Sequence, residues 1–182
     1  MKRVIHFFYI AVVLLLLPSC GYNVRDVVAL QDMKSHPVVF PTSLRMTIGG
    51  EYCDFCKIPE GIKLVVYVDS SVCNACVVSK LEKYHELEHM GNNKLHVAII
   101  MNPKGGEEEI VLQELSHYEH FFPVFIDTSS DFLLNNPHIP RDNRFHIFLV
   151  DSSSVPVFVG NPSANLKMLK RFDFVFREIS HK

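Results

Sequence analysis

The chain alternates short apolar runs with polar, turn-forming stretches over most of its length. Ile62–Val68 and Leu95–Met101 are nearly continuous apolar runs of strand length, which is typical of strands buried on both faces of a sheet. Elsewhere apolar residues recur every three or four positions, which indicates helices with one buried face. The pattern predicts strands at Ser43–Ile48, Ile62–Val68, Leu95–Met101, Pro123–Asp127, Arg144–Val150 and Val155–Val159, and helices at Asp26–Lys34, Cys73–His89, Glu107–Tyr118, Asp131–Asn136 and Ala164–Ile179.

The order of these elements predicts the fold class. A strand, a helix and a further strand form a unit with parallel strands, whereas the last two strands are joined by the short turn Asp151–Ser154 and form an antiparallel hairpin. We therefore expect an α/β fold, a three-layer sandwich with a central mixed β-sheet flanked by helices. Residues 43–182 are expected to form this domain, and residues 20–42 an N-terminal tether.

Composition and charge exclude several classes of protein. Of the 182 residues, 48% are hydrophobic and 21% are charged, so the chain can bury enough apolar surface to fold and is neither disordered nor fibrous. The formal net charge is -2, and Lys and Arg form no run. Because nucleic-acid binding needs a basic patch, no nucleic-acid partner is expected.

Residues 1–19 have the pattern of an export signal. Lys2 and Arg3 precede an unbroken apolar run from Phe7 to Leu17, which is too short to span a bilayer but has the length of a signal-peptide core. Leu17-Pro18-Ser19-Cys20 resembles a bacterial lipobox, which implies cleavage before Cys20 and lipidation of that cysteine. The acyl chains would anchor the protein to a bacterial membrane, on its periplasmic or surface-facing side. A plain secretory signal is the alternative.

The four remaining cysteines form two Cys-x-x-Cys pairs, Cys53 with Cys56 and Cys73 with Cys76. Two interpretations compete. The spacing falls in the range of a four-thiolate zinc site. Alternatively, at least one pair is a thiol–disulfide redox centre, which the oxidising conditions outside the cytoplasm favour.

The position of Cys73 favours redox chemistry for the second pair. Cys73 is predicted to lie where a buried strand ends and a helix begins, and unpaired N–H groups at a helix start stabilise a thiolate. Cys76 lies one helical turn further on, within bonding distance. We therefore expect Cys73 to be the attacking thiolate and Cys76 the resolving thiol.

Two segments resemble a known family. Lys63-Leu-Val-Val-Tyr-Val-Asp-Ser-Ser-Val-Cys73-Asn-Ala-Cys76 is similar to the strand and active-site turn of thioredoxin-like proteins, and above all of the lipid-anchored envelope proteins of the TlpA/ResA type. Phe145-His-Ile-Phe-Leu-Val-Asp-Ser-Ser-Ser-Val-Pro-Val-Phe-Val-Gly160-Asn-Pro162 resembles the late hairpin of that family. The resemblance covers about residues 60–180.

This resemblance implies a thioredoxin-like fold and a catalytic dithiol made by Cys73 and Cys76. It also implies partners: envelope proteins with disulfides or thiols, an upstream redox donor or acceptor, and the membrane through the lipid anchor. No cofactor is implied.

The chain departs from the family at three places. The family usually has an aromatic residue before the first cysteine, often a buried acid in the preceding strand, and a cis-proline before the late strand. Here Val72 and Tyr67 take the first two places, and Arg144 or Phe145 the third. Asp69 is expected to be a turn residue, with a proton-handling role as the alternative.

The other candidate residues have several interpretations. Cys53 and Cys56 are predicted in a turn, where they form a structural disulfide, a second redox pair or part of a metal site. His85 and His89 lie four residues apart on one helix, where a solvated face is expected and metal chelation is the alternative. His146 begins the late strand, where an ordinary strand-face histidine is expected and a position bordering the active site is the alternative.

Three functions follow from these observations. The first is a membrane-tethered thiol–disulfide oxidoreductase. The second is a non-catalytic binding or assembly lipoprotein with structural disulfides. The third is a metal-binding protein that uses all four thiolates.

Overall fold

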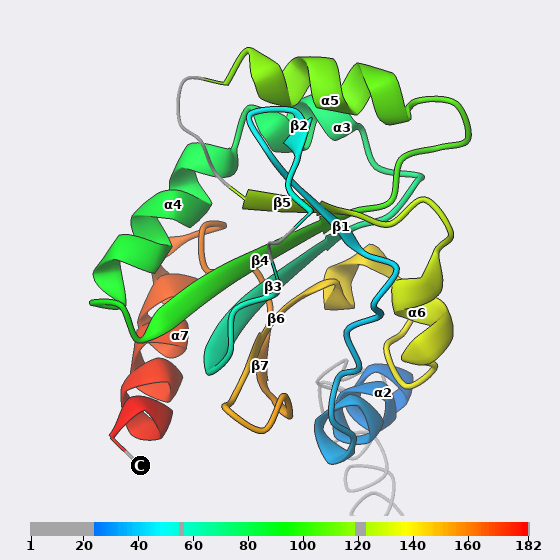
Figure 1. The fold of residues 1–182 in the computed structure, drawn as a ribbon. Helices are drawn as coiled ribbons and strands as arrows, with labels where there is room; N and C mark the ends of the chain where they lie inside the picture. Colours follow the sequence, from blue (N-terminus) through cyan, green and yellow to red (C-terminus); the bar gives the residue numbers. More distant parts are fainter. Residues whose placement is uncertain (1–23, 55–56, 119–122, 182) are drawn as a thin grey trace, which may run out of the picture.

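A mixed β-sheet forms the centre of the molecule (Figure 1). The structure is a computed structural model that describes residues 24–54, 57–118 and 123–181. In these ranges the strands follow the spatial order β2-β1-β5-β4-β3-β6-β7. The strands are β1 (Arg45–Ile48), β2 (Glu51–Tyr52), β3 (Ile62–Val68), β4 (Leu95–Met101), β5 (Pro123–Ile126), β6 (Ile147–Val150) and β7 (Pro156–Val159).

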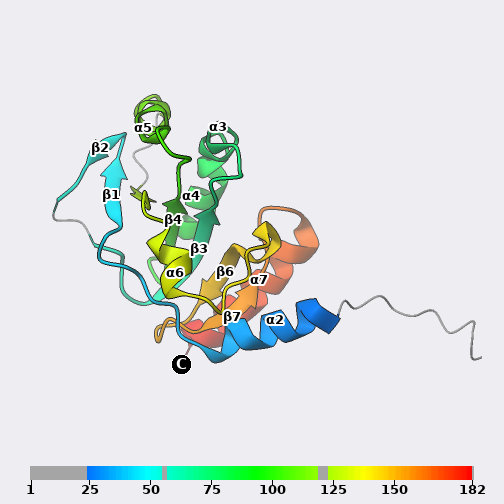
Figure 2. The same cartoon turned by 90° about the vertical axis from the view of Figure 1, so that its right-hand side faces the viewer.

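Helices cover both faces of the sheet, which gives the three predicted layers (Figures 1 and 2). One apolar core lies between the sheet and α3, α4, α5 and α7. The other lies between the sheet and α2 and α6. The helices are α2 (Val24–Ser35), α3 (Asn74–Val78), α4 (Leu81–Met90), α5 (Glu108–Ser116), α6 (Asp131–Asn135) and α7 (Leu166–Ser180), with a short 3₁₀ helix, η1 (Asn143–Phe145).

The central strands confirm the predicted topology. All seven residues of β3 are buried, because both of its faces lie under helices. β3 is parallel to β4, and β4 is parallel to β5. On its other side β3 pairs antiparallel with β6, which forms an antiparallel hairpin with β7. The expected α/β fold with a mixed sheet is therefore confirmed.

The N-terminal strand belongs to a hairpin that the sequence pattern did not predict. β1 pairs antiparallel with both β2 and β5. Gly49 and Gly50 form the turn with φ values of 59° and 82°, in the left-handed region that glycine adopts without strain. A Cβ atom on Gly50 would collide with the backbone oxygen of Leu112, so glycine also allows α5 to approach the hairpin closely.

The segment predicted as a tether includes a packed helix. The expected helix Asp26–Lys34 is present as α2, which lies against β7. Met33 is completely buried in the second core, and the loop that follows is fixed by hydrogen bonds between Val39 and Asn136 in both directions (2.7 Å each). This part of the N-terminal segment is thus a component of the domain's core.

The single helix predicted at Cys73–His89 is wrong, because the structure has two helices there, α3 and α4. In a continuous α-helix the N–H of Lys80 would donate to the carbonyl of Cys76. Instead the Ser79 hydroxyl donates to that carbonyl (3.1 Å), and Lys80 N–H donates to Val77 O (2.8 Å). A serine hydroxyl that competes for a backbone carbonyl weakens a helix, which explains the break.

The late strand is shorter than the predicted Arg144–Val150. β6 begins at Ile147, and Asn143–Phe145 forms η1. The carboxylate of Asp142 accepts the backbone N–H of Arg144 (2.9 Å) and so caps this helical turn. The polar cap stabilises a turn where the apolar pattern alone indicated an extended chain.

Within the described ranges, no helix is both long enough and apolar enough to cross a membrane. The predicted signal peptide, residues 1–19, and the lipidation site at Cys20 lie outside the described residues.

Candidate redox site

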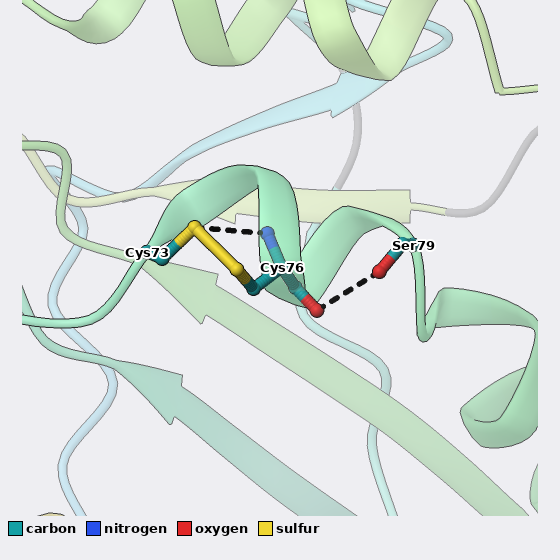
Figure 3. Close-up of a disulfide and its surroundings, with 3 residues drawn as sticks. All are labelled: Cys73, Cys76 and Ser79. Carbon is teal, nitrogen blue, oxygen red and sulfur yellow. Dashed lines mark hydrogen bonds between the residues drawn. A yellow bond between two sulfur atoms is a disulfide. The ribbon is translucent and has the colours of Figure 1, made fainter.

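Cys73 and Cys76 lie together at the start of α3, close to the end of β3. Cys73 directly precedes the helix, and Cys76 is its third residue. Their sulfur atoms form a disulfide with a Cα–Cα distance of 5.3 Å (Figure 3). Both residues are exposed. The predicted juxtaposition is therefore present, and another protein can approach the sulfurs.

The helix start also provides the expected hydrogen bond to sulfur. The backbone N–H of Cys76 donates to Sγ of Cys73 at 3.3 Å (Figure 3). Cys73 thus occupies the N-cap position of α3, with sulfur as the capping acceptor. A hydrogen bond to the charged form of a group favours that form, so this N–H lowers the free energy of a Cys73 thiolate relative to the thiol. Because α3 has five residues, this local donor matters more than the dipole of a long helix.

The turn between β3 and the disulfide is held by Asp69. Its carboxylate accepts the N–H of Ser71, and its backbone oxygen accepts the N–H of Val72, each at 2.9 Å. Burial raises the pKa of Asp69, but the hydrogen bonds from Ser71 and the charges of His146 and Arg141 outweigh it, so the pKa lies below its usual value. This bonding is that of a turn residue.

Tyr67 lies in β3, at the position where the family resemblance implies a buried acid. Its side chain is buried, at 3% exposure. Its hydroxyl donates to the side-chain oxygen of Asn102 (3.0 Å), and its ring stacks on Phe132. Burial raises the pKa of Tyr67 to about 12. The side chain is therefore a neutral phenol at physiological pH and does not act as a proton acceptor there.

His146 is the residue directly before β6. It is 2% exposed, and its ring meets Tyr67 edge-on with the centroids 5.1 Å apart. Its Nε2–H donates to Pro140 O (3.0 Å), whereas Nδ1 is buried without a hydrogen-bond partner. Burial lowers the pKa of His146. No described peptide bond is cis.

The loop that contains His146 is also joined to the turn before Cys73. The side-chain amide of Asn143 donates to the Ser71 hydroxyl at 3.4 Å. Asp69 lies in the same turn as Ser71, and its electrostatic interaction with His146 lowers the pKa of Asp69. His146 lies just outside β6, not on the expected strand face, and its contacts are with Tyr67 and Pro140. A position bordering the disulfide stays a prediction.

The first cysteine pair lies in a different part of the molecule. Cys53 follows β2, and its N–H donates to Met46 O (2.9 Å). It lines a cavity of about 690 Å³ to which neither Cys73 nor Cys76 contributes. Cys56 lies outside the described residues, so the Cys53–Cys56 disulfide stays a prediction.

The helix histidines are paired with each other. The Nε2 atoms of His85 and His89 are 3.0 Å apart, and their rings meet edge-on. Among the residues that the structure describes, no group of three or more His, Cys, Asp or Glu side chains is placed to hold a metal ion.

Comparison with known proteins identifies the fold. No family model and no curated protein matches the chain. One solved structure that does match is a thioredoxin-like protein, determined in solution in the oxidised form, with a TM-score of 0.50 and 17% sequence identity. The match covers 78% of this chain and 94% of the other protein. The chain therefore has a thioredoxin-like fold, with a cysteine pair near a helix start as in redox sites of the Cys-x-x-Cys type.

Proposed function

We propose that the protein is a membrane-tethered thiol–disulfide oxidoreductase with Cys73 and Cys76 as its catalytic dithiol. One observation carries the proposal. An exposed disulfide lies at a helix start, with a backbone N–H directed at the sulfur of Cys73. This arrangement provides both access for a substrate and stabilisation of the thiolate that the reaction needs.

The proposed reaction exchanges one disulfide for another. In the reducing direction the Cys73 thiolate attacks a substrate disulfide, forms a mixed disulfide and releases one substrate thiolate. The Cys76 thiolate then attacks the Cys73 sulfur, which releases the second substrate thiolate and leaves the Cys73–Cys76 disulfide. Two electrons pass to the substrate, and a dithiol protein restores the reduced pair. The oxidising direction follows the same steps in reverse, with a disulfide protein as the final electron acceptor.

The roles of the two cysteines follow from their places in α3. Cys73 is the capping residue, so its sulfur receives the N–H of Cys76. Cys76 lies inside the first turn, where its own sulfur is positioned to attack Cys73. Cys73 is therefore proposed as the nucleophile and Cys76 as the resolving residue.

The proposed location is the cell envelope of a bacterium, with a lipid on Cys20 as the anchor. The sequence pattern of residues 1–20 supports this location. The proposed partners are envelope proteins with disulfides or thiols, together with a redox donor or acceptor. A tethered enzyme of this kind would act on proteins near the membrane surface.

A second candidate is a binding lipoprotein whose disulfides are structural. Tyr67 favours it, because this neutral side chain occupies the position in β3 where the family resemblance implies a buried acid that could accept a proton during exchange. The four-thiolate metal site is a weaker candidate. It needs both cysteine pairs as thiolates, whereas Cys73 and Cys76 are joined to each other.

A trapping experiment tests the oxidoreductase. Full-length Cys76→Ser protein, expressed in the cell envelope, should accumulate mixed disulfides through Cys73, because no thiol remains to resolve them. Non-reducing electrophoresis and mass spectrometry would detect and identify the trapped proteins. The Cys73→Ser/Cys76→Ser variant is the matched control and should trap nothing through α3.

Alkylation kinetics give an independent measurement. The reduced protein should show a Cys73 thiol with a pKa below about 7, compared with about 8.5 for an unperturbed cysteine. An unreactive pair at neutral pH, together with no trapped adducts, would favour the binding lipoprotein.

A further inference from the structure

A groove lies between the last residues of α3 and the C-terminal half of α5. It has a volume of about 330 Å³ and is lined by Val78, Ser79, Glu114, His117 and Tyr118. We call it the α3–α5 groove. The two helices contact each other and lie side by side in both views of the fold (Figures 1 and 2).

The α3–α5 groove begins one helical turn after the resolving cysteine. Ser79, at its edge, donates its hydroxyl to the carbonyl of Cys76 (Figure 3). Residues three apart on a helix lie about 5–6 Å from each other. The groove therefore begins next to the resolving cysteine, and a polypeptide joined to Cys73, at the other end of α3, can extend along this helix toward it.

Glu114 leaves an unpaired negative charge in the groove wall. Its Oε2 atom is buried and has no hydrogen-bond partner. In the described part of the chain, its carboxylate forms no ion pair. A buried acceptor without a donor is unfavourable, so such atoms in native proteins usually have a partner. A cation bound in the groove would offset this cost through electrostatic attraction to the carboxylate.

None of the other described residues that line the groove forms an ion pair with Glu114. His117 donates its Nδ1–H to Gln113 O (2.6 Å), within its own helix. Val78 and Tyr118 provide apolar surface. The carboxylate of Glu82, on α4, also acts electrostatically on Tyr118. The groove thus combines a negative group with apolar walls.

We propose that the α3–α5 groove binds a lysine or arginine side chain of the polypeptide substrate, with Glu114 as the ionic partner. The apolar walls suit the methylene stem of such a side chain, and the carboxylate suits its charged end. This proposal rests on the oxidoreductase function and adds a specificity determinant to it. Because an extended chain advances about 3.3 Å per residue, the basic residue is expected about two to four positions from the reacting cysteine.

Paired peptides test the proposal. Two dithiol peptides would be identical except for Lys or Gln three positions from one cysteine, and stopped-flow measurements would give the rate constant for reduction of the Cys73–Cys76 disulfide. The wild-type protein should react about tenfold faster with the Lys peptide at low salt. This preference should decrease as the ionic strength rises.

Variants of α5 assign the preference to one residue. Glu114→Gln should remove the preference for Lys, and Glu114→Lys should favour a matching Glu peptide. Glu109→Gln changes an exposed residue of the same helix and is the matched control, which should keep the wild-type preference. Circular dichroism would verify that each variant is folded.

The possible outcomes distinguish a failure of the groove proposal from a failure of the proposed redox function. Dithiothreitol has no basic group that Glu114 could bind, so the Glu114→Gln substitution should change its rate of disulfide reduction much less than that of the Lys peptide. If all the peptides react but Lys gives no advantage, or the advantage survives in Glu114→Gln, the groove proposal is wrong and the redox function stands. If dithiothreitol alone reacts and neither peptide does, both proposals are overturned.

Discussion

His146 is a buried residue whose protonation is expected to affect the loop before β6. The ring of His146 contacts Tyr67 and donates to Pro140 O, and His146 also interacts electrostatically with Asp69. Its Nδ1 atom has no hydrogen-bond partner, and a proton there would create a charge in a buried environment. Titration of this one side chain is therefore coupled to the stability of the loop that contacts the turn before Cys73.

This coupling predicts a dependence of stability on pH. Burial lowers the pKa of His146 in the folded protein, whereas the unfolded chain keeps a value near 6.5. As the pH falls through about 6.5 toward the lower folded pKa, the unfolded state binds more protons, and the free energy of unfolding decreases. For one such group the slope is at most about 1.4 kcal/mol per pH unit. Burial also lowers the pKa of His138, which acts in the same direction.

Urea unfolding between pH 5 and pH 7 measures this effect in wild type and in His146→Gln. The glutamine amide can still donate to Pro140 O but does not titrate, so the variant should lose less stability in acid. His117→Gln alters an exposed histidine and should behave like wild type. Equal slopes for all three proteins would exclude His146 as the titrating group.

At the scale of the elements, α3 and α2 differ most from what the sequence pattern predicted. The apolar spacing from Cys73 to His89 is continuous, yet Ser79 ends α3 by binding the carbonyl of Cys76. This break depends on the hydrogen bond that the Ser79 hydroxyl forms, and the spacing of apolar residues does not predict that bond. Its consequence is chemical, because stabilisation of the Cys73 thiolate then rests on nearby N–H groups rather than on a long dipole.

Helix α2 is a structural part of the domain, and core packing tests this. Met33→Ala removes a completely buried side chain from the second core, so the free energy of unfolding should fall by about 2–4 kcal/mol. Val28→Ala, on the exposed face of the same helix, should change it by less than about 0.5 kcal/mol. Chemical denaturation of both variants gives the comparison, and similar small effects would mean that α2 is detached in solution.

At the scale of the whole molecule, the sheet determines where the proposed redox site lies. β3 enters the centre of the sheet, is buried along its full length and ends just before the disulfide. The buried strand fixes the position of Cys73, while the turn and α3 leave both sulfurs exposed. A rigid strand and an open helix start together give a site that is precisely placed and still reachable by a second protein.

Reduction of the disulfide should change the stability of the molecule by a small amount. The Cys73–Cys76 bond closes a loop of four residues, for which the loss of entropy in the unfolded chain corresponds to about 2 kcal/mol. The N–H of Cys76, which is directed at the Cys73 sulfur, favours the Cys73 thiolate and so offsets part of this difference in stability. The oxidised protein should therefore be more stable than the reduced protein, by less than about 2 kcal/mol.

Urea unfolding with and without a reductant measures the difference. The Cys73→Ala/Cys76→Ala variant, treated in the same way, gives the contribution of the other cysteines. A reduced form more stable than the oxidised form would reverse the expected sign and would make the protein an oxidant of dithiol substrates.

The sequence by itself determined the order of the central strands and helices and the position of Cys73 and Cys76 at a strand–helix junction. These features are local, since each depends on residues within one or two turns or strands of the chain. The extra hairpin strand β2, the packing of α2, the burial of His146 against Tyr67 and the unpaired carboxylate of Glu114 were decided by the tertiary structure. They depend on contacts between distant segments, such as the hydrogen bonds between Val39 and Asn136, 97 residues apart. No local pattern records such contacts, because they exist only after the sheet has brought the segments together.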